Sequence, residues 1–308
     1  MQYWLLPKLS NPNRTSRQIL LPESLTIGVV QFKPRWGEVE SNLAATSEIL
    51  SAAAMEGCKV VVLPEMWPTG MYGDLDFHKF KQTVPGPFTD FLTDHAKKHS
   101  FFVIAGIPER GVGNELHNTS VMVSDEGVIL AKHRKVQVYT FLGEEKIWTP
   151  GNKFTVLDTK IGRVGLLVCY DGDFPESWRI NALMGADIVF HISAYESPCE
   201  NWWEKFYPAA ALQNVVWAIL CNTVGDTVLN GKPVHLFGRS RMIAPDGEIV
   251  AEAPYVPQGA KSDSYLLVKT IQAKRRLDEA RTKFGNFLKD RRPEVYGALL
   301  EKSQPNIS

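Results

Sequence analysis

Two patterns of hydrophobic and polar positions recur along the chain. Short β-branched runs predict buried strands, and longer segments with apolar residues three and four positions apart predict helices. The predicted strands are residues 25–32, 59–65, 101–107, 161–170, 187–194, 215–223 and 264–270. The predicted helices are residues 41–57, 88–99, 175–185 and 203–214.

Two further segments are predicted to be hairpins. They are residues 120–136, with Gly127 at the turn, and residues 238–254, with Gly247 at the turn. Because hairpins interrupt the strand–helix alternation, the pattern differs from that of one doubly wound sheet. We expect an α/β fold in which two mixed sheets pack face to face and helices cover the outer faces, a four-layer α-β-β-α sandwich.

The pattern indicates a single domain over residues 25–270, since it contains no repeat, low-complexity tract or linker. Residues 1–24 are polar and rich in Pro and Asn, which predicts an N-terminal extension. Residues 271–308 form a C-terminal tail.

Composition excludes several classes of protein. The chain has 34 Lys and Arg and 34 Asp and Glu, so its net charge of zero gives no bulk attraction to nucleic acid or to a membrane surface. No apolar run approaches the ~20 residues of a membrane span, and the first residues lack the features of a signal peptide. The 4 cysteines form no disulfide or metal-binding pattern. We expect a cytoplasmic protein, and we interpret the glycosylation sequon at Asn118 as chance.

Several common functional motifs are absent. The chain has no GxxxxGK[ST] loop, no GxSxG turn and no HExxH helix motif. His133, His191 and His235 are candidates for a metal site if the fold brings them together, but scattered histidines are more often structural. We therefore expect no metal and no organic cofactor.

Three strand-like segments end in reactive side chains, at Glu65, Lys135 and Cys169. Functional groups collect at the carboxyl ends of strands in α/β folds. Taken singly, each residue has a plain structural interpretation as a surface carboxylate, an ion-pair partner or a core thiol. Taken together, the three residues describe one chemistry.

That chemistry is attack of a thiol on a carbonyl. A free cysteine has a pKa near ~8.5, so a neighbouring carboxylate that takes the proton activates it. The ammonium of Lys135 and the backbone N–H of Tyr170 are candidate donors for the resulting oxyanion. The carboxylate of Glu65 could then protonate the leaving amine and activate water.

The segments LPEMWPTGMY, HRKVQV and CYDGDFPE, in this order, resemble the three signatures of the nitrilase, or carbon–nitrogen hydrolase, superfamily. The resemblance covers about residues 25–270. It implies the α-β-β-α sandwich, no cofactor, and assembly into a homodimer, with the C-terminal tail as a candidate for the interface. It also implies that Cys169 is the nucleophile, Glu65 the general base and acid, and Lys135 the oxyanion-stabilising cation.

Members of the family often carry a second glutamate that positions the substrate. Both Glu144 and Glu145 are candidates, and the spacing to Pro150 favours Glu144. The sequence Cys-Tyr-Asp at the nucleophile is more similar to the amidase and N-carbamoyl amidohydrolase branches than to true nitrilases. The resemblance therefore implies hydrolysis of a linear amide or N-carbamoyl compound, with release of ammonia through a cysteine thioester. Nitrile hydrolysis, acyl transfer and a non-catalytic scaffold remain alternatives.

The turn after Cys169 is expected to expose the sulfur. We expect Asp171 and Asp173 to hold this turn and to cap the helix that starts near Pro175, rather than to take part in chemistry.

The segment AYESPCENWWEKFY follows a predicted strand and is rich in aromatic and acidic residues. With Tyr170, it supplies candidates for substrate binding, namely Tyr195, Glu196 and Trp202. The alternative is that Trp202 and Trp203 pack beneath the next helix. An acidic pocket would favour a small substrate that bears an amine.

Overall fold

The computed structural model describes residues 21–301, so most of the predicted extension at residues 1–24 lies outside the described residues. The first sheet has the strand order β14-β1-β2-β3-β4-β5. Its strands are β1 (Leu25–Gln31), β2 (Val60–Val62), β3 (Phe102–Arg110), β4 (Leu116–Val123), β5 (Ile129–Arg134) and β14 (Tyr265–Ile271). Strands β1, β2 and β3 are parallel, and the remaining neighbours pair in antiparallel fashion.

The second sheet has the order β13-β12-β9-β8-β7-β6 and a parallel centre made of β7, β8 and β9. Its strands are β6 (Thr155–Thr159), β7 (Gly162–Val168), β8 (Ile188–Ser193), β9 (Trp217–Asn222), β12 (Arg241–Ile243) and β13 (Ile249–Glu252). A separate hairpin consists of β10 (Val224–Leu229) and β11 (Lys232–Phe237).

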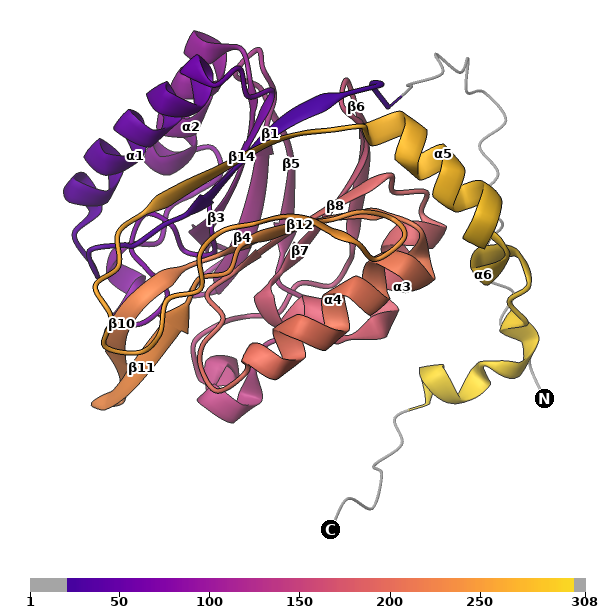
Figure 1. Ribbon diagram of the computed structural model, residues 1–308. Coiled ribbons are helices and arrows are strands. Elements are labelled where there is room, and N and C mark those ends of the chain that lie inside the picture. Colours follow the sequence, from indigo (N-terminus) through magenta and orange to yellow (C-terminus); the bar gives the residue numbers. More distant parts are fainter. Residues whose placement is uncertain (1–20, 302–308) are drawn as a thin grey trace.

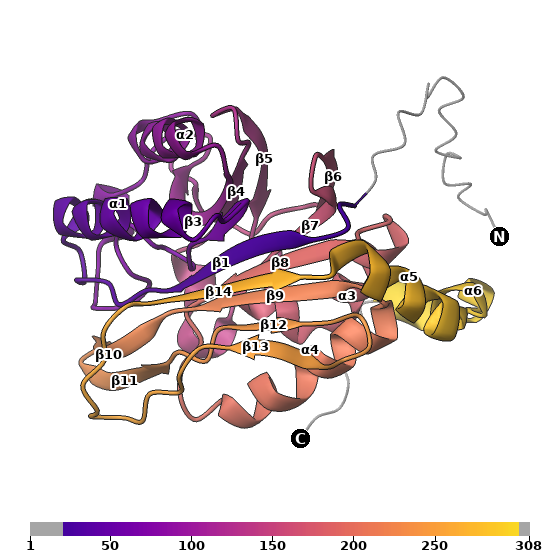
Figure 2. The ribbon, with the colours of Figure 1, turned by 45° about the horizontal axis from the view of Figure 1, so that its top comes forward.

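Helices cover the outer faces of both sheets (Figures 1 and 2). Helices α1 (Val39–Met55) and α2 (Pro87–His99) lie on the first sheet, and α3 (Pro175–Leu183) and α4 (Glu200–Asn214) lie on the second. Strand β3 shows how one sequence serves two interfaces. Its Ile104 packs between the sheets, whereas Val103 and Ala105 pack against the helices, as the alternation of side chains along a strand requires. The four-layer sandwich predicted from the sequence is confirmed.

The chain directions bring the ends of several strands to one edge. Strand β5 runs in the same direction as β2 and β3, because each of the pairs β3–β4 and β4–β5 is antiparallel. In the second sheet, β7 and β8 are parallel and end beside each other. The residues that follow β2, β5, β7 and β8 therefore gather at the carboxyl ends of the strands, where α/β folds build their functional sites.

The sequence reading missed several elements. Strands β6, β10 and β11 were not predicted, although Asn230 and Gly231, with φ of 52° and 68°, form the kind of Asn-Gly turn that joins two-residue hairpins. The tail contains helix α5 (Ala273–Phe284) and the short helix α6 (Asn286–Lys289), neither of which was predicted. Helix α5 buries Leu277 and docks on the second sheet through the hydrogen bond from Trp217 Nε1 to the Ala273 carbonyl.

Short 3₁₀ segments complete the described structure. They are η1 (Phe77–Lys79), η2 (Thr140–Leu142), η3 (Glu144–Lys146), η4 (Cys169–Asp173), η5 (Pro293–Val295) and η6 (Gly297–Leu300). Within residues 21–301, none of the helices has the length and apolar character needed to cross a bilayer.

Candidate active site

Lys135 lies at the centre of a buried cluster of charges. It follows β5 directly, and its ammonium lies 3.3 Å from Oε1 of Glu65 and 2.9 and 2.8 Å from the two carboxylate oxygens of Glu144. All three side chains are buried. Of the two candidate glutamates, Glu144 makes this contact and Glu145 is exposed. The structure therefore brings together three of the four residues that the resemblance assigns to catalysis.

The Glu65 carboxylate is held in a fixed orientation. Its Oε1 accepts a hydrogen bond of 2.6 Å from Asn118 Nδ2, and its Oε2 accepts one of 2.8 Å from the backbone N–H of Ala194, at the end of β8. The backbone of Glu65 also passes close to Gly106, where an added Cβ would lie 2.7 Å from the Glu65 Cα. A side chain at Gly106 would displace the carboxylate.

The opposite charges of the cluster shift the pKa values of Glu144 and Lys135 toward their ionised forms. Burial raises the pKa of Glu144, while the Lys135 ammonium beside it acts in the opposite direction. Burial alone would lower the pKa of Lys135, but the negative charges of Glu144 and Glu65 outweigh burial and hold that pKa well above its usual range. The lysine is therefore an ammonium at neutral pH, as an electrostatic role requires.

Cys169 follows β7 at a strained turn. Its φ of +46° lies in the left-handed region, which costs a residue other than glycine ~1–3 kcal/mol and is often found at functional sites. Its carbonyl accepts a hydrogen bond of 2.7 Å from His191 Nε2. Burial, reinforced by the charge of Glu65, raises the pKa of the Cys169 thiol well above its usual range despite the opposing charge of Lys135. The thiol is therefore protonated at neutral pH and needs a base during attack. It is less exposed than the sequence suggested, at 7%.

Asp171 ties this turn to the opposite sheet. Its Oδ1 accepts hydrogen bonds of 2.9 and 2.8 Å from the backbone N–H groups of Val136 and Gln137, just after the lysine. Its Oδ2 accepts from the backbone of Val168 at 3.1 Å and lies 3.0 Å from His133 Nε2. The expectation that Asp171 holds the turn is thus confirmed. The aspartate also fixes the spacing between the cysteine and the lysine.

The expectation that Asp173 caps a helix is wrong. Helix α3 has no side-chain cap at its N-terminus. The Asp173 carboxylate instead accepts hydrogen bonds of 2.9 Å from the hydroxyls of Tyr195 and Tyr207. Burial raises the pKa of Asp173 to about 6, although both tyrosines act in the opposite direction. The two tyrosine hydroxyls therefore hold the Asp173 carboxylate away from the start of α3.

A narrow pocket opens beside the cysteine and has a volume of only about 10 Å³, enough for about one water molecule. Its walls contain every residue that the sequence suggested for substrate binding. These wall residues include Tyr170, Tyr195, Glu196 and Trp202, together with Tyr139, Asp173 and Cys169.

Two of the wall residues have distinct environments. Glu196 accepts a hydrogen bond of 3.1 Å from the Tyr72 hydroxyl, and burial raises the pKa of Glu196 to about 7. Trp202 is 42% exposed, whereas its neighbour Trp203 is fully buried in the core. The packing alternative therefore applies to Trp203 and not to Trp202.

The three histidines singled out in the sequence have separate partners. His133 contacts Asp171, His191 bonds the Cys169 carbonyl, and His235 lies 2.6 Å from Asp226. Within the part of the chain that the structure describes, no group of three or more His, Cys, Asp or Glu side chains could hold a metal ion.

Sequence reasoning missed Asn118 and Tyr72. The only signal at Asn118 was a glycosylation sequon, yet its side chain is buried against Glu65. Tyr72 is the last residue of the first signature segment, and its hydroxyl also lies 3.2 Å from the Ala194 carbonyl. Asn118 could not be assigned before the fold had brought β4 beside the loop after β2, and Tyr72 could not be assigned before that loop lay beside the segment after β8.

Comparisons with known proteins agree with this geometry. The family model for carbon–nitrogen hydrolase matches residues 26–281. A nitrilase from Pyrococcus abyssi is 30% identical over 277 residues, which cover 88% of this chain and 98% of the relative. The omega-amidase NIT2 of Homo sapiens is 28% identical over 270 residues, 85% of this chain and 93% of the relative.

Solved structures give the same result. The crystal structure of a carbon–nitrogen hydrolase from Helicobacter pylori G27 superposes with a TM-score of 0.80 at 27% identity. That match covers 91% of this chain and 99% of the other. The matched fold, the extent of the family model and the order of the three signature segments lead to one conclusion: this chain belongs to the carbon–nitrogen hydrolase family of the nitrilase superfamily.

Proposed function

We propose that this protein hydrolyses a linear amide or an N-carbamoyl compound and releases ammonia through a thioester on Cys169. The observation that carries the proposal is the Glu65 carboxylate, held by Asn118 and Ala194 beside the Lys135 ammonium in the same buried site as a protonated thiol. The relatives include both a nitrilase and an omega-amidase, and the sequence Cys-Tyr-Asp at the nucleophile supports an amide over a nitrile as the substrate.

In the first half of the reaction, the Cys169 sulfur forms a bond to the carbonyl carbon and its proton passes to Glu65. The negative charge that develops on the carbonyl oxygen is stabilised by Lys135 and by the backbone N–H of Tyr170, and one such donor is typically worth ~100–1000-fold in rate. The C–N bond then breaks, and Glu65 returns the proton to the nitrogen, which leaves as ammonia.

In the second half, Glu65 takes a proton from a water molecule, whose oxygen attacks the thioester carbon. The C–S bond breaks, the sulfur regains the proton, and the acid leaves. For an N-carbamoyl substrate the acid that leaves is a carbamic acid, which loses carbon dioxide and becomes the free amine, so the products are ammonia, carbon dioxide and the amine. Glu144 keeps the ammonium of Lys135 in position throughout, through contacts of 2.9 and 2.8 Å.

The pocket beside Cys169 favours a substrate that bears an amine. Its walls combine two acidic side chains, Asp173 and Glu196, with tyrosines and Trp202, and none of the residues that line it is Lys or Arg. Carboxylates and aromatic faces both stabilise a cation. Kinetics on cationic and anionic amides of equal size test this point, and preference for the anionic amide contradicts it.

The test of the proposed reaction is ammonia release from a panel of amides, N-carbamoyl amino acids, N-carbamoyl amines and nitriles. We expect release from at least one amide or N-carbamoyl compound and complete loss in Cys169→Ala. Cys58→Ala is the matched control, because Cys58 is a buried thiol in the core beneath α1 and α2, away from the charged cluster. Hydrolysis of nitriles alone would support the nitrilase alternative, and no release from any class would support the scaffold.

We further propose a cytoplasmic homodimer. All four cysteines are free thiols, in keeping with a reducing compartment. The tail beyond α5 exposes several large apolar side chains, including Phe287, Leu299 and Leu300, which a second copy of the chain could cover.

A further inference from the structure

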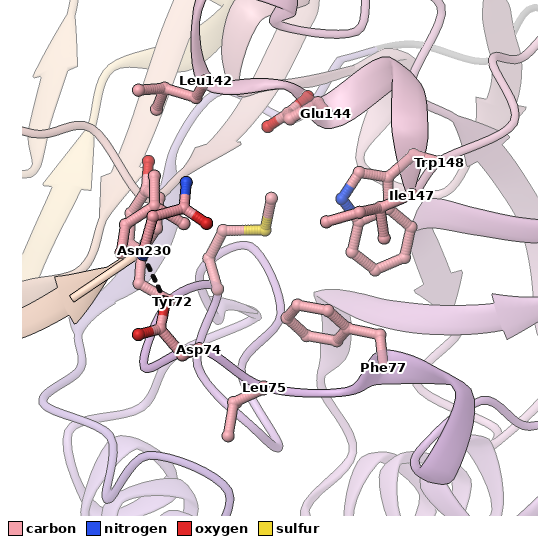
Figure 3. A pocket seen from close by; sticks show the side chains of 11 residues that line it. Tyr72, Asp74, Leu75, Phe77, Leu142, Glu144, Ile147, Trp148 and Asn230 are labelled. Carbon is pink, nitrogen blue, oxygen red and sulfur yellow. Dashed lines mark hydrogen bonds between the residues drawn. The ribbon is translucent and has the colours of Figure 1, made fainter.

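A second and larger cavity lies next to the charged cluster. It has a volume of about 400 Å³, within the ~300–1,000 Å³ of typical small-molecule sites. In Figure 3, Leu75 and Phe77 lie at the bottom of the cavity, Leu142 at its upper left and Ile147 at its right. Leu75 and Phe77 come from the segment that follows β2, and Leu142 and Ile147 come from the segment around η2 and η3. Most of its wall is therefore apolar.

Glu144 and Tyr72 connect this cavity to the candidate active site. Both residues line the cavity. On its other side, the Glu144 carboxylate contacts the Lys135 ammonium, and the Tyr72 hydroxyl bonds Glu196 in the wall of the cysteine pocket. The two side chains thus border both the cavity and the catalytic cluster, so a group in the cavity lies against Glu144, the residue that positions the lysine.

One hydrogen-bond donor in the cavity has no partner. Trp148 is 2% exposed, and its Nε1 has no hydrogen-bond acceptor among the described residues. In Figure 3 the indole nitrogen points into the cavity. The two carboxylates in the wall are already engaged, since Asp74 accepts from the backbone of Asn230 and Gly231 and Glu144 contacts Lys135. A buried donor without a partner is unfavourable, so an acceptor in the cavity would be bound selectively.

The charges around the cavity restrict what it can hold. Its two acidic residues are Asp74 and Glu144, and none of its lining residues is Lys, Arg or His. An anion would therefore be repelled, whereas an uncharged apolar group would bury its surface against the aliphatic and aromatic walls. A single carbonyl or ether oxygen on that group would satisfy Trp148.

We propose that this cavity binds an uncharged, mainly apolar group that carries one hydrogen-bond acceptor for Trp148 Nε1, and that this group is the part of the substrate remote from the scissile bond. The inference that the cavity binds such a group at Trp148 rests on the geometry alone. The assignment to the substrate rests on the proposed hydrolase function.

Nuclear magnetic resonance tests the cavity without any reaction. The indole N–H signal of Trp148 is assigned by its disappearance in Trp148→Phe, and the protein is titrated with 2-hexanone. We expect a downfield shift of this signal that saturates, as a new hydrogen bond requires. Leu142→Trp, which fills the cavity from a partly exposed position, is expected to abolish the shift. The absence of a saturable shift in the unmodified protein would overturn the proposal.

Stability provides an independent readout of the free donor. Trp148→Phe leaves a void beside Phe77 but removes an N–H without a partner, so its melting temperature is expected to fall less than that of a variant that also loses a hydrogen bond. Trp217→Phe is the matched control, because Trp217 Nε1 donates to the Ala273 carbonyl at 3.0 Å, and its melting temperature should fall. An equal fall in both variants would show that the Trp148 N–H already has a partner and would overturn the proposal.

Kinetics test the assignment to the substrate. The ratio of kcat/KM for 5-oxohexanamide to that for hexanamide is expected to fall about 3- to 10-fold in Trp148→Phe, the effect of one neutral hydrogen bond. An unchanged ratio with a saturable 2-hexanone shift would keep the cavity as a site for a separate small molecule and overturn the substrate assignment. Hydrolysis of no amide, with the shift intact, would overturn the proposed function and leave the cavity standing.

Discussion

The side-chain amide of Asn118 donates a hydrogen bond of 2.6 Å to Oε1 of Glu65. This bond joins a strand of the first sheet to the carboxylate that takes and returns the proton in the proposed mechanism. Oε1 also lies 3.3 Å from the Lys135 ammonium, and Oε2 accepts from the Ala194 backbone. The amide therefore helps to fix the orientation of the carboxylate, with Oε1 toward the lysine and Oε2 toward Ala194. Asn118 is therefore a positioning residue.

Replacement of Asn118 by alanine is expected to lower kcat about 10- to 100-fold with little change in KM, since the amide acts on the base and not on bound substrate. Steady-state kinetics measure the split between the two constants. Thr119→Ser, at the next position of the same strand, is the control and should leave kcat within about twofold. A rise in KM alone in Asn118→Ala would show that the amide binds substrate instead.

Replacement of Lys135 by methionine is expected to lower both stability and activity, for two different reasons. It removes the cation between two buried carboxylates, which is expected to lower the free energy of unfolding by about 3–5 kcal/mol. Activity should fall by at least about 100-fold, through loss of the oxyanion donor.

Adding Glu144→Gln to Lys135→Met separates these effects. The double variant removes one of the two unpaired charges, so urea denaturation should show partial recovery of stability. Ammonia release should remain at the level of Lys135→Met. Recovery of activity together with stability would mean that Lys135 acts only as a structural ion-pair partner.

The environment of Glu196 predicts a pH dependence. Its pKa is raised to about 7 by burial, so the folded state holds this proton more tightly than the unfolded chain does. The resulting stabilisation is fully present below about pH 4, the usual range of a glutamate, and is lost as the pH rises through about 7. Thermal melts of the unmodified protein and Glu196→Gln should therefore diverge between these limits, with the variant losing less stability.

The same carboxyl should control the binding of a cationic substrate. Only the ionised form attracts a cation, so KM for an amine-bearing amide is expected to fall as the pH rises through about 7. Glu196→Gln should remove this dependence while KM for an uncharged amide stays flat in both proteins. An identical pH profile for the cationic amide in both proteins would contradict a role for Glu196 in binding.

Removal of residues 286–308 tests the proposed dimer. The deletion begins beyond α5 and therefore keeps the buried Leu277 and the hydrogen bond between Trp217 and Ala273. We expect analytical ultracentrifugation to show a dimer for the full chain and a monomer for the shortened one. A monomeric full chain would contradict the dimer, and a dimeric shortened chain would place the interface elsewhere.

The sequence predicted the layers of the fold because buried strands and amphipathic helices leave strong periodic patterns. It missed the β10–β11 hairpin, whose strands VGDTVL and KPVHLF are short and contain Gly, Pro and scattered polar residues, although Asn230-Gly231 was a readable turn signal. It also missed α5, whose apolar stripe of Ala273, Leu277 and Ala280 is hidden among charged residues.

Some residues of the site could be predicted from the sequence and others could not. Glu65, Lys135 and Cys169 each follow a strand at the edge where α/β folds place functional groups, so spacing and residue type sufficed. Asn118 and Tyr72 act through contacts between segments far apart in the chain, which no local pattern reports. Asp173 was misassigned because its position before α3 resembles that of a capping residue. In the structure its carboxylate accepts hydrogen bonds from two tyrosine hydroxyls that are distant in the sequence.

The central claim is that Cys169 carries the acyl group during turnover. Its most direct test is intact-mass spectrometry of the protein quenched in acid during turnover of the best substrate in the amide and N-carbamoyl panel. The account predicts an added mass equal to the substrate acyl group, located on the peptide that contains Cys169 and absent from Cys169→Ala. Ammonia release by Cys169→Ala at the rate of the unmodified protein, with no adduct on either protein, would contradict it.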